Sequence, residues 1–102
     1  MTIDVPKVCG EDIISRDSGK KIREMILAHW DQEVIPIEFG GRTVGSLSFF
    51  DEAIGLLLKQ DGKPMEEIKK KIKFQGLKPE DKKLLNYVMS ARVREMGENR
   101  RS

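Results

Sequence analysis

The sequence predicts a small α/β domain in which a mostly parallel or mixed β-sheet is packed by about three to four α-helices. Residues 34–39 form a short run of β-branched and aromatic side chains, which is typical of a buried strand. Residues 40–48 are rich in glycine and serine, and a stripe at helical spacing follows: Phe50, Ala53, Ile54 and Leu57. A strand, a loop of small residues and a helix form half of a βαβ unit. Because functional groups gather beyond the carboxyl ends of such strands, we expect the site there.

Length and composition indicate one globular domain. A chain of 102 residues can form a single core, which we expect to span residues 1–97, while the polar residues 98–102 fray. The 19 basic and 17 acidic side chains leave a net charge of +2, which is too small to indicate a nucleic-acid partner. The single cysteine, Cys9, excludes an internal disulfide and suits a reducing compartment. A secretory pattern is absent and no apolar run approaches the roughly 20 residues of a membrane span, so we expect a cytoplasmic protein.

The first third of the chain predicts a strand followed by a helix. Residues 3–8 alternate loosely between apolar and polar, and Pro6 cannot donate to a ladder, so this segment is predicted to be an edge strand. Ser15 or Asp17 caps a helix that runs to about Trp30. Its predicted apolar side carries Ile22, Met25, Ile26 and Trp30. Its predicted solvent side carries Lys20, Lys21, Arg23 and Glu24.

The last 40 residues predict a turn, a second helix–strand pair and a final helix. Residues 60–64 form the turn, residues 65–71 begin as a helix, and residues 71–75 are assigned to a strand. Pro79 suits the first turn of a helix that runs to about Met96. Its predicted buried face carries Leu84, Leu85, Val88 and Ala91. Connections of this length favour parallel neighbours, although the direction of the first strand stays open.

Few residues indicate catalysis. We interpret His29 as a surface or boundary residue and Cys9 as a small buried thiol. The glycines after the central strand match neither a P-loop nor a dinucleotide fingerprint, and no set of side chains has metal-ligand spacing. We therefore expect a protein that is not an enzyme and that needs no cofactor or metal.

A lysine-rich stretch is interpreted first as a solvated face, because acidic residues alternate with its basic ones. The lysines are Lys63, Lys69, Lys70, Lys71, Lys73, Lys78, Lys82 and Lys83. Four C-terminal arginines add positive charge: Arg92, Arg94, Arg100 and Arg101. The alternative hypothesis is therefore a nucleic-acid-associated accessory domain that uses the C-terminal third.

Ser48 and Asp51 fit a capping box, with serine at the N-cap and an acid three residues later. The alternative is regulatory phosphorylation of Ser48 or Ser46, since a helix N-terminus stabilises an added phosphate. The carboxylates of Asp51 and Glu52 oppose that phosphate by like-charge repulsion. Both interpretations stay open.

Three short motifs resemble those of the STAS-like domains of unknown function, relatives of the sulfate-transporter and anti-sigma-factor-antagonist fold. The motifs are Ser15-Arg16 before the first helix, IEFGG at 37–41 and SFFDE at 48–52. Glu38 stands where those antagonists usually have aspartate, and Leu47 falls on their usual phosphorylation position with Ser48 beside it. Phe50 replaces the family's usual alanine.

The resemblance implies a regulatory protein-binding module rather than an enzyme. Its expected partner class is a histidine-kinase-like ATP-binding protein of the anti-sigma type. The expected partner surface consists of Gly45, Ser46, Leu47, Ser48, Phe49, Asp51 and Glu52.

Overall fold

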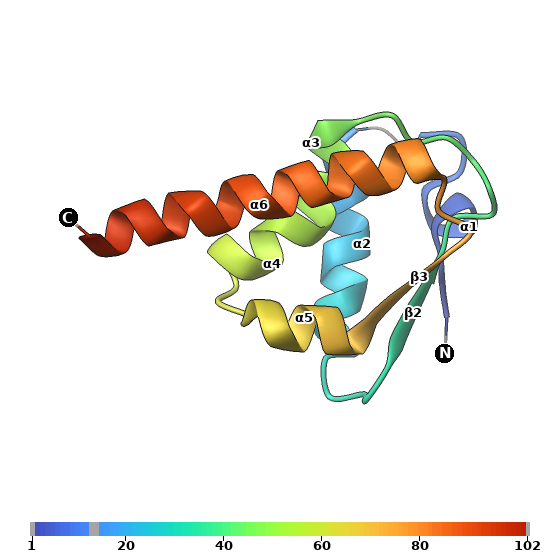
Figure 1. Ribbon diagram of the computed structural model, residues 1–102. Coiled ribbons are helices and arrows are strands. Elements are labelled where there is room, and N and C mark those ends of the chain that lie inside the picture. The colour runs from blue at the N-terminus through green and yellow to red at the C-terminus, as the bar shows by residue number, and fades with distance from the viewer. Residues whose placement is uncertain (1, 13–14, 102) are drawn as a thin grey trace.

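The computed structural model describes residues 2–12 and 15–101, and its centre is a three-stranded parallel sheet (Figure 1). The strands are β1 (Ile3–Asp4), β2 (Ile35–Glu38) and β3 (Ile72–Gln75), in the order β1-β2-β3. Ile37 of β2 pairs with Ile3 on one side and with Phe74 on the other. The α/β prediction with a parallel sheet is confirmed, and the open direction of the first strand is parallel.

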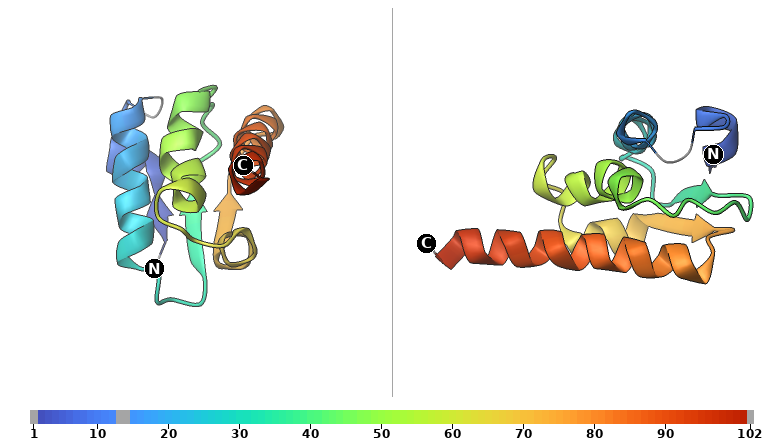
Figure 2. Two further views of the ribbon diagram at one scale, coloured as in Figure 1. Left: turned by 90° about the vertical axis from the view of Figure 1, so that its left-hand side faces the viewer. Right: turned by 90° about the horizontal axis from the view of Figure 1, so that it is seen from above.

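Helices cover one face of this sheet (Figure 2). They are α1 (Val5–Cys9), α2 (Arg16–Ala28), α3 (Leu47–Phe50), the π-helical turn η1 (Asp51–Gly55), α4 (Leu56–Lys59), α5 (Met65–Lys71) and α6 (Pro79–Arg101). Segments α3, η1 and α4 form one continuous helix between α2 and α6. In the described part of the chain, no helix is long and apolar enough to cross a membrane.

The core lies between the sheet and this helical layer. Ile35 and Ile37 of β2 are fully buried, whereas Pro36 and Glu38, which alternate with them along the strand, are only half-buried. The predicted helical stripe of Phe50, Ala53, Ile54 and Leu57 is buried. Phe50, at the family's alanine position, therefore adds its bulk to the core and not to an exposed contact.

The predicted N-terminal edge strand over residues 3–8 is wrong beyond its first two residues. The chain turns into α1 after Asp4, whose carboxylate accepts a hydrogen bond from the Lys7 backbone N–H at 3.2 Å. Pro6 lies in the first turn of α1, where its missing N–H costs no helical hydrogen bond. The same proline that suggests an edge strand thus also fits a helix start.

Arg23 was predicted to face solvent, and that prediction is wrong. Its side chain is 7% exposed, because α2 packs closely against η1. Gly19 makes this approach possible, since a Cβ there would lie 2.7 Å from the carbonyl oxygen of Phe49. The predicted cap of this helix is confirmed at Ser15, whose hydroxyl accepts from the Ser18 N–H at 3.1 Å.

The C-terminal elements follow the prediction except at their margins. The helix α5, the strand β3 and the start of α6 at Pro79 are confirmed. Helix α6 continues to Arg101 instead of ending near Met96, so residues 98–101 form helix where fraying was expected; Ser102 lies outside the described residues. Ala91, predicted to be buried, is exposed, and Met89 is buried instead.

Candidate functional site

The loop that leaves β2 is shaped by its glycines. Gly40 and Gly41 both have positive φ, at 65° and 73°, which a side chain would strain. The Glu38 carboxylate folds back and accepts a hydrogen bond from the Gly40 N–H at 2.7 Å. Gly76 lies against this carboxylate so closely that a Cβ there would collide with it. The carboxyl end of β2 is therefore held by backbone contacts with the chain after β3.

Asp81 fixes the second half of the loop. Its side chain is fully buried, and its two carboxylate oxygens accept from the backbone N–H groups of Val44 and Gly45, each at 2.8 Å. Asp81 lies in the first turn of α6, where the helix dipole favours negative charge. The start of α6 thereby sets the position of the chain that enters α3.

We expect Asp81→Asn to lower the free energy of unfolding by about 1–3 kcal/mol, because the amide offers one acceptor oxygen to two backbone donors, of which the Val44 N–H is in a buried hydrogen bond. The neighbouring change Glu80→Gln, at an exposed position, serves as the matched control and should leave this free energy within about 0.5 kcal/mol. Urea unfolding measures both variants. Equal stability of the two variants would show that Asp81 does not hold the loop.

Ser46, not Ser48, caps the helix at the site. The Ser46 hydroxyl accepts a hydrogen bond from the Phe49 N–H at 3.2 Å, and α3 begins at Leu47. The predicted capping box of Ser48 and Asp51 is therefore wrong by two residues. Ser48 instead lies in the first turn of α3 with an exposed side chain.

A shallow groove of about 250 Å³ runs between α3 and α6. Leu47 and Tyr87 line it with 43% and 66% of their surfaces exposed. The other lining residues are Arg16, Ser48, Asp51, Val88, Ala91, Arg92 and Glu95. The groove thus combines apolar surface, the hydroxyls of Ser48 and Tyr87, and charges of both signs.

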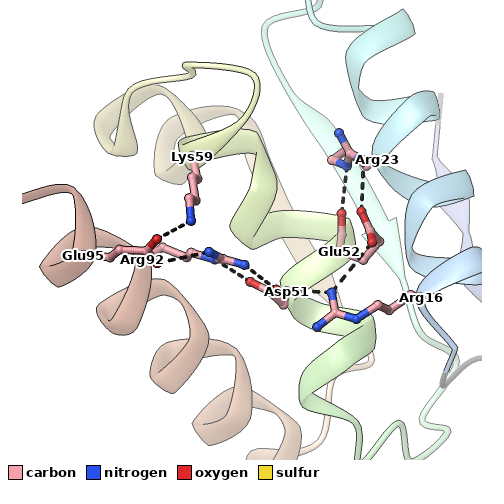
Figure 3. A network of polar contacts seen from close by, with 7 residues as sticks. All are labelled: Arg16, Arg23, Asp51, Glu52, Lys59, Arg92 and Glu95. Carbon is pink, nitrogen blue, oxygen red and sulfur yellow. Dashed lines mark hydrogen bonds and ion pairs between the residues drawn. The ribbon is translucent and has the colours of Figure 1, made fainter. Parts of the chain in front are cut away.

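An ion-pair network forms the floor of this groove (Figure 3). Arg92 contacts the Asp51 carboxylate through two nitrogens, at 2.7 and 2.6 Å, and Arg16 reaches the same carboxylate at 3.3 Å. On the other side, Arg23 pairs with Glu52 at 3.0 Å. The adjacent carboxylates at 51 and 52 therefore join α6 and α2 to the central helix.

Asp51 stays ionised within this network. Burial raises its pKa, but the hydrogen bonds and charges of Arg92 and Arg16 outweigh burial and lower the pKa below its usual value. The hydrogen bond to Asp51 in turn raises the pKa of Arg92. The side chain of Arg16 is 55% exposed, and Glu95 at the other end of the network is 40% exposed, so a partner can reach both.

Only some of the residues of the predicted partner surface line the groove. Leu47, Ser48 and Asp51 line the groove, whereas Phe49 is 1% exposed and cannot contact a partner. The sequence interpretation missed Tyr87 and Arg92, which lie almost 40 residues further along the chain. The positions 87, 88, 91, 92 and 95 of α6 share one helical face, but only the fold shows that this face meets α3.

The other candidate residues have structural roles. A ring nitrogen of His29 lies 2.9 Å from the Met25 carbonyl oxygen at the end of α2. Cys9 is half-buried, its thiol donates to the Ser18 carbonyl oxygen at 3.8 Å, and burial raises its pKa. Within residues 2–12 and 15–101, no group of three or more His, Cys, Asp or Glu side chains is placed to hold a metal ion.

The basic C-terminal third is partly neutralised by the fold. Arg92 pairs with Asp51 and Glu95, and Lys59 pairs with Glu95 as well. Lys78 donates to the hydroxyl of Thr43 at 2.9 Å. The nucleic-acid hypothesis therefore stays a prediction that rests on the remaining exposed lysines and arginines.

Comparison with known proteins bears on the family alone. Searches of curated proteins and of solved structures gave no significant match. Residues 18–82 match the family described as the STAS-like domain of unknown function (DUF4325). This range contains the sheet strands β2 and β3, the loop, the whole central helix and Asp81, while Arg16 and Arg92 lie outside it. The match covers well over half of the chain, which therefore belongs to the STAS-like domains of unknown function.

Proposed function

We propose that this domain is a regulatory protein-binding module whose partner seats on the groove between α3 and α6. The observation that carries the proposal is the pair of exposed side chains Leu47 and Tyr87, which flank the reachable guanidinium of Arg16. Aromatic and arginine side chains are the groups that most often dominate binding energy at protein interfaces. The role proposed for this groove is binding and not catalysis.

The partner class is a histidine-kinase-like ATP-binding protein of the anti-sigma type in the cytoplasm. The family resemblance supports this choice, because anti-sigma-factor antagonists bind such proteins through the helix that follows the central strand. Here that helix begins at Leu47, and its first turn borders the groove. Of the surface expected at residues 45–52, the proposed partner surface keeps Leu47, Ser48 and Asp51. It also includes Tyr87 and Arg16, which line the same groove.

Ser48 is the proposed site of regulation. Its exposed hydroxyl lies in the groove with Arg16 and Asp51. A phosphate carries a charge of about −1.5 to −2, so it repels Asp51 and competes for Arg16. That exchange changes the charge of the groove and releases the partner. Ser46 is the less suitable acceptor, because its hydroxyl already caps the helix.

Capture from an extract of the native host tests the surface. We expect Leu47→Ala and Tyr87→Ala each to lower the amount of captured partner at least about tenfold, because interface anchors contribute about 1.4 kcal/mol or more. Lys73→Ala, at an exposed position of β3, is the control and should capture as well as the native chain. Thermal unfolding checks that all variants fold. If the groove variants capture the partner normally, the surface assignment is wrong.

The same extract tests the regulation. Mass spectrometry of the native protein should detect a phosphate on Ser48, and Ser48→Asp should release the captured partner. Ser90→Asp places the same charge on another exposed serine, of α6, and controls for charge alone. Unmodified Ser48 under several growth conditions, together with normal capture by Ser48→Asp, would contradict the phosphorylation step but not the binding surface.

A further inference from the structure

A second groove lies on the other side of α6, facing α5. Two hollows form it, one of about 570 Å³ beside the turn before α5 and one of about 430 Å³ further along α6. The two hollows adjoin each other, since Met65 and Val93 line both. Positions 89 and 93 of α6 face this groove, whereas positions 88 and 92 face α3. One helix therefore borders two separate surfaces.

The floor of this α5–α6 groove is apolar. Val93 is 45% exposed, Met65 and Met96 are half-buried, and Met89 and Leu58 complete the floor. Methionine side chains are flexible and polarisable, which suits a surface that receives the apolar face of a partner. Along α6, positions 89, 93 and 96 span about 10 Å, which is two helical turns. An approaching helix can therefore seat anchors at spacings of three, four and seven residues.

The rim of the groove is mostly basic. Lys69 and Arg94 line the second hollow, and neither has an ion-pair partner within the part of the chain that the structure describes. Lys63 also borders the groove, although its ammonium lies over the ring of Trp30, 5.0 Å from the ring centroid. Among the residues whose side chains the structure describes, Glu66 is the one acidic residue that lines the two hollows. The rim therefore complements acidic side chains.

We propose that the α5–α6 groove binds an amphipathic helix of another protein. Its apolar stripe seats on Met65, Met89 and Val93, and its acidic flank pairs with Lys69 and Arg94. This surface does not depend on the α3–α6 groove, so both partners bind at the same time. A helix is the occupant that fits best, because it presents an apolar stripe and a charged flank together in a shape that lies between two helices.

Methyl NMR with ¹³C-labelled methionine tests the proposal on the full chain. The probe is a peptide of about 20 residues, with leucine at positions i, i+3, i+4 and i+7 and glutamate at its flanks, long enough to form a helix. We expect the methyl signals of Met65, Met89 and Met96 to shift on titration, while that of Met25 in α2 stays in place. The same peptide with lysine in place of each glutamate should bind at least about tenfold more weakly, equivalent to 1.4 kcal/mol.

Three double variants test the location and the charge preference. Lys69→Glu combined with Arg94→Glu should invert the preference, so that the lysine peptide binds better. Lys20→Glu combined with Lys21→Glu changes the net charge equally at exposed positions of α2, away from the groove, and should keep the native preference. Leu47→Ala combined with Tyr87→Ala should bind the acidic peptide normally, because these residues line the α3–α6 groove only.

Three results would overturn the proposal. The first is that the groove methyl signals do not move, and the second is that both peptides bind equally well. The third is that the same signals move on dilution without peptide, which would show that a second copy of the chain occupies the groove. The result of partner capture through the α3–α6 groove has no bearing on these outcomes, so the two surfaces are tested independently.

Discussion

Replacing Arg23 with alanine is expected to lower the free energy of unfolding by about 3–5 kcal/mol, because it removes the buried cation that two partly buried carboxylates share. Glu52 then keeps the contact with the exposed Arg16, at 3.7 Å. The guanidinium donates to the Glu52 carboxylate at 3.0 Å and to the Asp61 carboxylate at 3.1 Å. These carboxylate side chains are only 15% and 19% exposed, so water compensates little for the lost pairing. Urea unfolding monitored by the fluorescence of Trp30 measures the loss.

A third contact makes this arginine difficult to replace. Its Nε donates to the backbone carbonyl oxygen of Glu52 at 2.9 Å. Glu52 lies in the π-helical turn η1, where the wider spacing of hydrogen bonds leaves backbone groups for side chains to satisfy. Lysine can supply the charge but not three donors in a planar fork. We therefore expect Arg23→Lys to keep less than half of the stabilisation.

Arg16→Ala is the matched control for this prediction. Arg16 belongs to the same helix and contacts Asp51 and Glu52, but its side chain is 55% exposed. Exposed ion pairs contribute about 0–1 kcal/mol, so the control should lose no more than that. If Arg23→Ala and Arg16→Ala lost equal amounts, the buried position of Arg23 would not explain its contribution.

Most of the fold could be predicted from local patterns in the sequence. The strand β2, the buried stripe of the central helix and the helix–strand junction at residue 71 follow from spacing and turn residues alone. The predictions were wrong where the same local sequence pattern fits two different secondary structures. Pro6 suits an edge strand and the first turn of a helix equally, and only the cap by Asp4 decides between them.

The site was harder to predict, because it depends on contacts between distant segments. Ser46 and Ser48 both lie at the start of the helix, and an acid follows Ser48 at the spacing of a capping box. Asp81 decides the outcome: by binding the Val44 and Gly45 N–H groups, it places Ser46 where the helix begins. No sequence pattern near the loop indicates a contact with Asp81, which lies 36 positions beyond Gly45. Tyr87 and Arg92 were missed for the same reason.

The neighbouring residues Leu47 and Phe49 separate stability from binding. Phe49→Ala is expected to lower the free energy of unfolding by about 3–5 kcal/mol, as truncation of a buried aromatic does. Its ring is 1% exposed and packs edge-on against Phe50, with ring centroids 5.6 Å apart, and against Phe39 at 6.4 Å. Leu47→Ala removes a side chain that is 43% exposed, so we expect a change within about 0.5 kcal/mol.

The two variants should give opposite results in the two assays. Thermal unfolding should show a lower midpoint for Phe49→Ala and an unchanged midpoint for Leu47→Ala. Partner capture by folded protein should show the reverse, because only Leu47 lies in the α3–α6 groove. Phe49→Leu keeps the core filled and should capture the partner normally. If Phe49→Leu stays folded but no longer captures the partner, the partner contacts the residue at position 49, and the assignment of the surface to Leu47 is wrong.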